Sequence, residues 1–390
     1  MQVNNVNYFF EEGFWIFLIG MFSYDGHVYG LQFDRNEILE LDKDGRGMYP
    51  IGSIPVTLED NGLKMFHRVV VNGEKAYFIP FMQNEVCIYD FRTKNYSCIS
   101  IEIDDKKRCK GQGLFYEGIV YGEYLVLLPF TYREILFINL KTKEQTSIDI
   151  ENEFSKETDI FLFRTYIYLN DHTVVVPSLS SNKVLELNLE TKTYRMKQVG
   201  NAEYKYGAAI TYEGKHYLLI KNYLGLLELN EELQTKDTHL MDAIDWDKKE
   251  RQTFFEPESF VSYGKALYCF PAKWNHAIKI DMETKKASYI ESMEVYCSAE
   301  GIEKDISIFD GCVKIGKYLY LQYQLDKVLR FDLETEEIKE YPRRIYDPEM
   351  NRLNRFLGMV LETRNNTSDI ENTNIGKKVF EEIKRDCERK

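Results

Sequence analysis

A five-residue segment recurs along most of the chain at nearly even spacing. It starts with an apolar or aromatic residue followed by Asp or Asn, and the clear copies end in Thr: Tyr89–Thr93 (YDFRT), Ile138–Thr142 (INLKT), Leu187–Thr191 (LNLET), Ile280–Thr284 (IDMET) and Phe331–Thr335 (FDLET). Two degenerate copies, Leu41–Gly45 (LDKDG) and Leu229–Leu233 (LNEEL), complete a series of seven with a mean period of about 48 residues. This period predicts stacked repeats that bury their apolar faces against one another rather than in one large core.

The recurring segment has a direct structural meaning. An Asp or Asn that ends a strand accepts hydrogen bonds from backbone N–H groups two residues further on, and Thr does so more weakly. We therefore expect these residues to build tight hairpin turns and not to act as catalysts. In the first copy Gly45 stands in place of Thr, where a residue with positive φ is expected.

Two further apolar runs precede each of these turns, and one shorter run follows it. A turn residue separates the first two runs in every repeat: Gly26, Gly73, Gly122, Asn170, Gly214, Gly264 and Gly316. The second run ends in Pro in four repeats, which suits a strand end because Pro has no N–H to donate: Pro80, Pro129, Pro177 and Pro271. Four antiparallel strands per repeat are typical of a β-propeller blade. The sequence therefore predicts an all-β fold, a seven-bladed β-propeller of four-stranded antiparallel blades over residues 1–342.

One stretch of the second repeat carries a resemblance to a known family. The segment YDFRTKNY (Tyr89–Tyr96) is similar to the YD-x-x-T-x-x-W segment of kelch repeats, and the chain resembles the bacterial kelch-like propellers in layout. It departs from them where a Gly-Gly doublet normally ends the second strand, and in lacking most of the Trp residues. The Trp-Asp and Gly-His pairs of WD40 repeats do not recur from one repeat to the next. The resemblance implies an architecture and no single function.

The net charge argues against nucleic acid as a partner. The chain has 50 Lys and Arg residues against 63 Asp and Glu residues, which gives a formal charge of −13. A surface that binds phosphates needs a positive field, so DNA, RNA and anionic membranes are not expected partners.

Neither the cysteine pattern nor any known catalytic motif indicates a cofactor. The seven Cys residues show no CxxC pair and no regular spacing, which is typical of reduced thiols rather than of a disulfide framework. Metal ligands at short fixed intervals are missing too, as are the P-loop, GxGxxG, HExxH and GxSxG motifs. We therefore expect neither a metal nor a cofactor.

The apolar segment Phe14–Phe22 (FWIFLIGMF) is predicted to be a buried inner strand. It is much shorter than the roughly 20 residues needed to span a bilayer, and Glu11 and Glu12 precede it in place of basic residues. We expect no membrane insertion and a cytoplasmic protein.

Residues 343–390 leave the repeat pattern and are predicted to form a helical C-terminal extension. Asp347-Pro348 is typical of a helix start, apolar residues at helical spacing follow it, and a second helix is predicted over Ile375–Arg385. These helices either pack on the propeller or serve as a docking element for a partner.

The long connection Thr238–Glu258, between the fifth and sixth repeats, also departs from the repeat pattern. Long insertions of this kind often carry function.

The candidate binding residues follow from the geometry of a propeller. If the strands of a repeat are named A to D, strand A lies nearest the axis, and the D–A connections share one face with the B–C loops. These two sets of loops differ in every repeat, whereas the A–B and C–D turns are short and alike. Variable loops on a rigid scaffold commonly build binding sites. The predicted ligand-binding residues are Arg68, Tyr116, Glu117, Arg164, Tyr206, Trp274, Glu258 and Asp310.

Two function classes remain open at this point. The first is a non-catalytic recognition propeller that binds a partner protein, a glycan or a small polar ligand at this face. The second is a propeller enzyme, a lyase or hydrolase, in which a carboxylate and a histidine act as acid and base. The catalytic candidates for the second class are Glu117, Glu258, Asp310, His67 and His276.

Overall fold

The structure is a computed structural model that describes residues 18–32, 37–54, 66–108, 113–153, 165–220, 225–238, 260–270, 276–297, 309–323 and 327–345. The chain divides into two compact units, Met1–Ile345 and Tyr346–Lys390. The second unit contains the predicted helices of the extension and lies outside the described residues. Those helices, and their role in docking, stay predictions.

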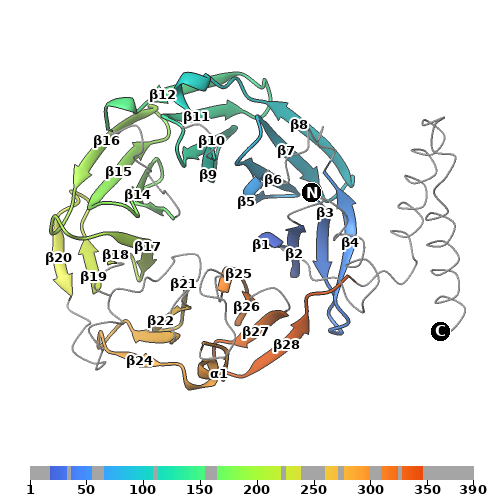
Figure 1. Ribbon diagram of the computed structural model, residues 1–390. Coiled ribbons are helices and arrows are strands. Elements are labelled where there is room, and N and C mark those ends of the chain that lie inside the picture. Colours follow the sequence, from blue (N-terminus) through green and yellow to red (C-terminus); the bar gives the residue numbers. More distant parts are fainter. Residues whose placement is uncertain are drawn as a thin grey trace, which may run out of the picture. The chain divides into compact units, whose positions relative to one another are not determined.

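Seven four-stranded antiparallel sheets follow one another around a ring, which confirms the predicted seven-bladed propeller (Figure 1). Each sheet, here blades 1 to 7, consists of four consecutive strands, and the first strand of each blade lies nearest the axis. Residues 18–22 of the apolar segment lie in β1, the inner strand of blade 1, as predicted.

The strands keep the order of the sequence within every blade. Blades 1 to 3 contain β1 (Leu18–Tyr24), β2 (His27–Gln32), β3 (Glu37–Leu41), β4 (Met48–Ser53), β5 (Phe66–Asn72), β6 (Lys75–Pro80), β7 (Glu85–Asp90), β8 (Asn95–Ser100), β9 (Phe115–Tyr121), β10 (Tyr124–Pro129), β11 (Glu134–Asn139) and β12 (Gln145–Asp149). Blades 4 to 7 contain β13 (Ile167–Tyr168), β14 (Thr173–Pro177), β15 (Lys183–Asn188), β16 (Thr193–Gln198), β17 (Tyr206–Tyr212), β18 (Lys215–Ile220), β19 (Gly225–Leu229), β20 (Thr235–Thr238), β21 (Phe260–Tyr263), β22 (Ala266–Cys269), β23 (Ile278–Asp281), β24 (Ala287–Tyr289), β25 (Phe309–Ile315), β26 (Tyr318–Tyr323), β27 (Lys327–Asp332) and β28 (Ile338–Pro342).

Helical structure is confined to short connections in the part of the chain that is described. It comprises α1 (Glu294–Cys297) and the 3-10 turns η2 (Asp105–Lys107), η3 (Glu151–Glu153) and η7 (Glu291–Met293). Within the described ranges, no helix combines the length and hydrophobicity needed to cross a membrane.

The Asp and Asn residues of the repeat close the C–D turns, as predicted. The Asp90 carboxylate accepts a 2.9 Å hydrogen bond from the Thr93 N–H, and Lys94 then takes a left-handed φ of 57°. The same acceptor role is filled in the other blades by Asp42, Asn139, Asn188, Asn230, Asp281 and Asp332. Gly45 has a φ of 88°, which confirms the expectation for the first copy.

The glycines of the A–B turns are required by backbone conformation. Gly73 and Gly122, for example, have φ values of 58° and 56°, in the left-handed region that L side chains disfavour. Blade 4 has Asn170 at this position, and its side-chain oxygen instead accepts hydrogen bonds from His172 N and Thr173 N at 3.0 and 2.9 Å.

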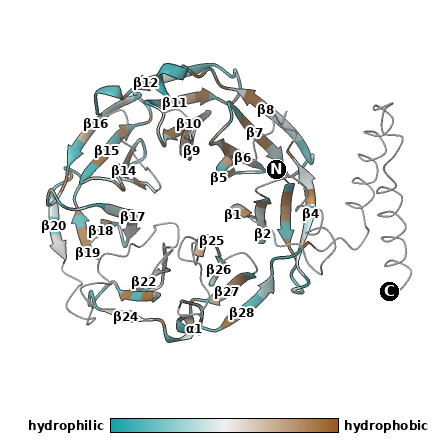
Figure 2. Cartoon of the chain, in the orientation of Figure 1, coloured by the Kyte–Doolittle hydropathy of each residue, from teal (hydrophilic) through white to brown (hydrophobic). Residues whose placement is uncertain are grey.

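The core of the protein lies between the blades. Side chains alternate across a strand, so each blade presents one apolar face to the preceding blade and one to the next. In β10, Leu125 and Leu127 pack toward blade 2, whereas Val126 and Leu128 pack toward blade 4. Among the described residues, one hydrophobic cluster fills each of the seven interfaces between neighbouring blades. Figure 2 shows hydrophobic colouring on the middle strands β10 and β11 and hydrophilic colouring on the outer strands β12 and β16.

The ring is closed by a short segment that follows the last strand. The backbone N–H of Met48 in β4 donates to Arg344 O at 2.7 Å, and Met48 and Ile345 form a parallel bridge. The Arg344 Nε donates to Arg46 O at 3.2 Å, and the neighbouring Arg343 side chain is fully buried. We call residues 343–345 the closing segment. The sequence placed these residues in the extension, but they contact blade 1.

We expect the closing segment to contribute measurably to stability. A chain ending after Pro342 loses the Met48–Arg344 hydrogen bond and leaves the space of the Arg343 side chain unfilled. Loss of one buried side chain with its contacts costs about 2 kcal/mol or more. Urea unfolding should therefore show a lower free energy of unfolding for this chain than for a control chain ending after Ile345. Equal values for the two chains would contradict the role of the segment.

The turn at Asp42, next to the closing segment, should make the stability of the protein depend on pH. Hydrogen bonds from the Arg46 side chain and N–H lower the pKa of Asp42 from 3.8 to about 2. A lowered folded-state pKa contributes stability above pH 4 that is lost as the pH falls through 2. Asp42→Asn should thus lower the Tm at pH 6, and the difference from wild type should shrink as the pH approaches 2. Thermal unfolding followed by circular dichroism measures this, with the exposed Asp44→Asn as the control.

Candidate functional site

The D–A connections and the B–C loops are hydrogen-bonded to one another on one face, which we call the rim. Between blades 2 and 3, Leu114 N donates to Phe81 O at 2.7 Å, and Phe130 N donates to Leu114 O at 2.8 Å. The Thr131 hydroxyl donates to Gly113 O at 2.7 Å. A Cβ at Gly113 would lie 2.2 Å from the Phe81 ring, so this close approach requires glycine. The predicted sharing of one face by the two sets of loops is therefore confirmed where they are described.

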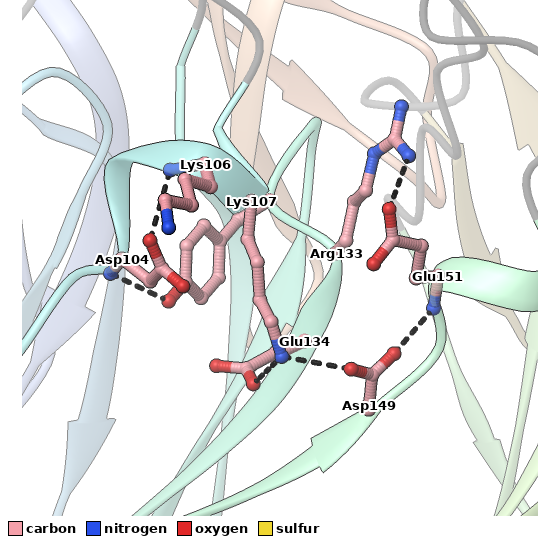
Figure 3. Close-up of polar contacts among 8 residues, drawn as sticks. Asp104, Lys106, Lys107, Arg133, Glu134, Asp149 and Glu151 are labelled. Atoms are coloured by element: carbon pink, nitrogen blue, oxygen red, sulfur yellow. Dashed lines mark hydrogen bonds and ion pairs between the residues drawn. The ribbon is translucent and has the colours of Figure 1, made fainter.

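Ion pairs stabilise the rim at blade 3 (Figure 3). Lys107 lies between two carboxylates, with its Nζ 2.5 Å from Glu134 Oε1 and 2.7 Å from Asp149 Oδ2. The hydrogen bonds from Lys107 lower the pKa of Asp149, and those carboxylates raise the pKa of Lys107. The Arg133 guanidinium lies 2.9 Å from Glu151 Oε1 on the next D–A connection. These charged side chains therefore pair with one another and stabilise the rim.

Strand A carries a β-bulge at its rim end in five of the blades. The registers shift between Ile19 and Met21, between Phe66 and Val69, opposite Leu128–Pro129, between Tyr206 and Ala208, and between Phe309 and Cys312. A bulge inserts an extra residue, bends the strand and re-aims side chains, and it is often found beside active sites. Six predicted site residues lie at or next to these bulges: His67, Arg68, Tyr116, Glu117, Tyr206 and Asp310.

An aromatic cluster joins blades 2 and 3 at the rim. It consists of His67, Phe81, Tyr116 and Phe130. The His67 ring lies 3.6 Å from the Tyr116 ring centroid and 5.3 Å from that of Phe81, and Phe130 contacts both Phe81 and Tyr116. His67 and Tyr116 are buried, with exposed fractions of 8% and 2%. The cluster is therefore a rigid wall in which His67 is largely enclosed.

A charged pair lies next to the aromatic cluster on the same two inner strands. The Arg68 Nε is 3.7 Å from Glu117 Oε2, and the two side chains are only 17% and 14% exposed. The other carboxylate oxygen of Glu117 accepts a 3.0 Å hydrogen bond from Gly118 N. Burial and the charge of Glu117 raise the pKa of Tyr166, which therefore stays a neutral hydroxyl near this carboxylate. Arg68 and Glu117 thus join blades 2 and 3, and Tyr166 packs in the interface between blades 3 and 4.

The remaining candidates lie elsewhere or outside the described residues. Tyr206 is fully buried, and its hydroxyl donates to Val199 O, so packing accounts for its position. His276 belongs to blade 6 and packs against Tyr289, with ring centroids 4.4 Å apart and the rings tilted by 36°. Asp310 lies in β25, but its side chain is outside the described set. Arg164, Glu258 and Trp274 are outside it entirely, as is most of the connection 238–258.

The sequence analysis missed two features of the site. Phe130 and Tyr166 were not among the candidates, although both are aromatic residues at the rim end of a blade. It also expected no metal ligands, yet Glu85, Cys87 and Cys98 place their ligand atoms within 4.8 Å of one another. Their spacing along the chain hides this group, because a hairpin turn separates Cys87 from Cys98. The signal that could have found it is a pair of Cys residues at positions that face each other across the predicted C–D turn.

Comparisons with known proteins show the fold. Virginiamycin B lyase from Staphylococcus aureus matches with a TM-score of 0.57 and 10% identity over 80% of this chain and 94% of that chain. An inactive variant of that lyase with quinupristin gives 0.56 and 9% identity, covering 80% and 93%. YCF48 from Cyanidioschyzon merolae gives 0.55 and 11% identity, covering 83% and 98%. At these identities the likeness extends to the propeller architecture alone.

Neither the protein-family models nor the curated proteins contain a match to this sequence. The structure and these comparisons show a seven-bladed β-propeller, and the resemblance to kelch repeats is limited to the turn segment Tyr89–Tyr96.

The ion pairs of the rim predict a stability difference between two lysines. Lys107→Ala leaves the largely buried Glu134 carboxylate without its cation, and an uncompensated buried group costs about 1–3 kcal/mol. Lys141→Ala removes an exposed pair with Glu123 and should cost at most about 1 kcal/mol. Chemical unfolding of both variants measures the difference. If Lys107→Ala is no more destabilising than the control, the rim pairs are not structural.

Proposed function

We propose that this protein is a non-catalytic recognition propeller that binds a partner protein at the rim, where blades 2 and 3 meet. The observation that carries the proposal is the Arg68–Glu117 pair, held at the strand-A bulges beside the aromatic cluster. Bulges at the same end of five inner strands support this end as the binding face, because bulges are common beside functional sites.

The geometry of the pair suits a ligand that both accepts and donates hydrogen bonds. The Arg68 Nε and Glu117 Oε2 atoms lie 3.7 Å apart, and both side chains keep some exposure, so a polar group of a ligand can contact both of them. The Arg68 guanidinium donates and the Glu117 carboxylate accepts, and a peptide backbone offers both a carbonyl and an N–H. The partly exposed Phe81 and Phe130 rings provide an apolar wall for a side chain of the same segment. A protein segment fits these three features together.

The burial of His67 favours binding over catalysis. In the alternative function, a lyase or hydrolase, Glu117 and His67 would act as acid and base. A general base must lie within hydrogen-bond reach of the proton that it takes from the substrate. The His67 ring is enclosed by Tyr116 and Phe81, which limits its contact with a ligand.

The proposed setting is the cytoplasm. Among the described residues, Cys87, Cys98, Cys269, Cys297 and Cys312 form no disulfide. Cys269 is fully buried, and burial raises the pKa of its thiol, so it is chemically quiet.

Binding should depend on Arg68 and Glu117 and not on a matched arginine of an outer strand. Peptide and glycan arrays identify a bound probe for the wild type, and calorimetry then gives its Kd. Arg68→Ala and Glu117→Gln should each raise that Kd at least tenfold, which corresponds to the loss of about 1.4 kcal/mol. The control Arg195→Ala removes an arginine that pairs with Glu186 on blade 4 and should leave the Kd unchanged.

A charge exchange separates binding from folding. In the double variant Arg68→Glu/Glu117→Arg the two charges still pair, so the Tm should be closer to wild type than in Arg68→Ala. In this variant the hydrogen-bond donor and acceptor have exchanged places relative to the ligand, so the ligand should not bind. A Kd unaffected by all three variants would show that the ligand binds elsewhere. If the arrays identify a glycan as the bound probe, the proposal of a protein partner is wrong.

A further inference from the structure

A cluster of three potential metal ligands lies in the outer hairpin of blade 2 and shares no residue with the aromatic cluster or the Arg68–Glu117 pair. Cys87 in β7 is directly opposite Cys98 in β8, and Glu85 lies two residues before Cys87 on the same face of the sheet. The two sulfur atoms and a carboxylate oxygen lie within 4.8 Å of one another. We call these residues the thiol–carboxylate cluster.

The donor set is the kind that zinc prefers. Zinc binds Cys sulfur at about 2.3 Å and carboxylate oxygen at about 2.0–2.2 Å, so tetrahedral ligands lie about 3–4 Å apart. The ligand atoms of the cluster lie within 4.8 Å of one another, so side-chain rotations would bring them to this spacing. Two sulfur donors select zinc-like ions over magnesium and calcium, which prefer oxygen ligands.

The residues around the cluster orient its ligands. The Ser100 hydroxyl donates to Glu85 Oε1 at 3.3 Å, and the Gln83 side chain donates to Glu85 O at 3.3 Å. Outer hydrogen bonds of this kind are typical of metal sites, because they fix ligand orientation.

The position of the cluster leaves a path to solvent. Cys87 is fully buried in the apolar interface between blades 1 and 2, whereas Glu85 and Cys98 are partly exposed. An ion can therefore reach the buried sulfur from the side of Cys98 and Glu85. The ion would join β7 to β8 at the interface with blade 1.

We propose that Cys87, Cys98 and Glu85 bind one divalent cation of the zinc class. Binding displaces the two thiol protons to solvent and forms two metal–sulfur bonds and one metal–oxygen bond, and water completes the coordination. The site is independent of the recognition function proposed for the rim. The ion clips the outer hairpin of blade 2 and stabilises the blade that carries Arg68.

Metal uptake by the full chain under reducing conditions tests the proposal. Zinc content after equilibrium dialysis should be one ion per chain, and substitution by Co²⁺ should produce the charge-transfer absorption of thiolate–cobalt bonds. Cys98→Ser should abolish that absorption, and Glu85→Gln should raise the Kd for zinc at least tenfold. The control Cys312→Ser, in β25 of blade 7, should behave as wild type.

Three results would overturn the proposal. One is the absence of zinc and cobalt uptake by the wild type. The second is uptake that both Cys98→Ser and Glu85→Gln leave unchanged. The third is a Cys87–Cys98 disulfide in the protein as isolated from cells, recognised by mass spectrometry, together with failure of the reduced protein to bind zinc. If Cys98→Ser does not fold, as judged by its circular dichroism spectrum, the partly exposed Glu85→Gln variant decides.

Discussion

The packing of each blade against two neighbours is the constraint on which the rest of the structure depends. A middle strand such as β10 sends Leu125 and Leu127 to one interface and Val126 and Leu128 to the other, so neither face of a blade is stable in water. Only a closed ring buries both faces of every blade. The closing segment, with the fully buried Arg343, completes the last interface, where blade 7 meets blade 1.

This constraint leaves the ends of the strands for function. Because both faces of each sheet are used in packing, side chains that can bind a partner must come from loops or from irregular strand ends. The bulges at the rim end of strand A do this for Arg68 and Tyr116, which leave the regular alternation of β5 and β9. The opposite ends of the blades are occupied by turns whose Asp, Asn and Gly residues serve the backbone, such as Asp90 and Gly73.

Cross-strand neighbours provide a second source of chemistry that does not depend on the loops. Cys87 and Cys98 meet because a hairpin of fixed register brings them opposite each other, and Glu85 joins them through the two-residue period of β7. The same register brings Tyr89 and Tyr96 into ring contact nearer the turn. The C–D turn therefore fixes which residues of β7 and β8 face each other. It determines both the contacts with blade 1 and the composition of the thiol–carboxylate cluster.

The seven blades, the strand order and the turn chemistry were determined by the sequence itself, because local hydrogen bonds at residues such as Asp90 and Asn139 repeat at a readable period. The face that carries Arg68, Tyr116 and Glu117 followed from that order. Tertiary structure alone decided that Tyr206 packs inside an interface, that His67 is enclosed by rings, and that Arg68 pairs with Glu117. These outcomes depend on contacts between blades and on bulges that shift the register by one residue. A sequence period records neither, because both arise only when separate repeats meet around the axis.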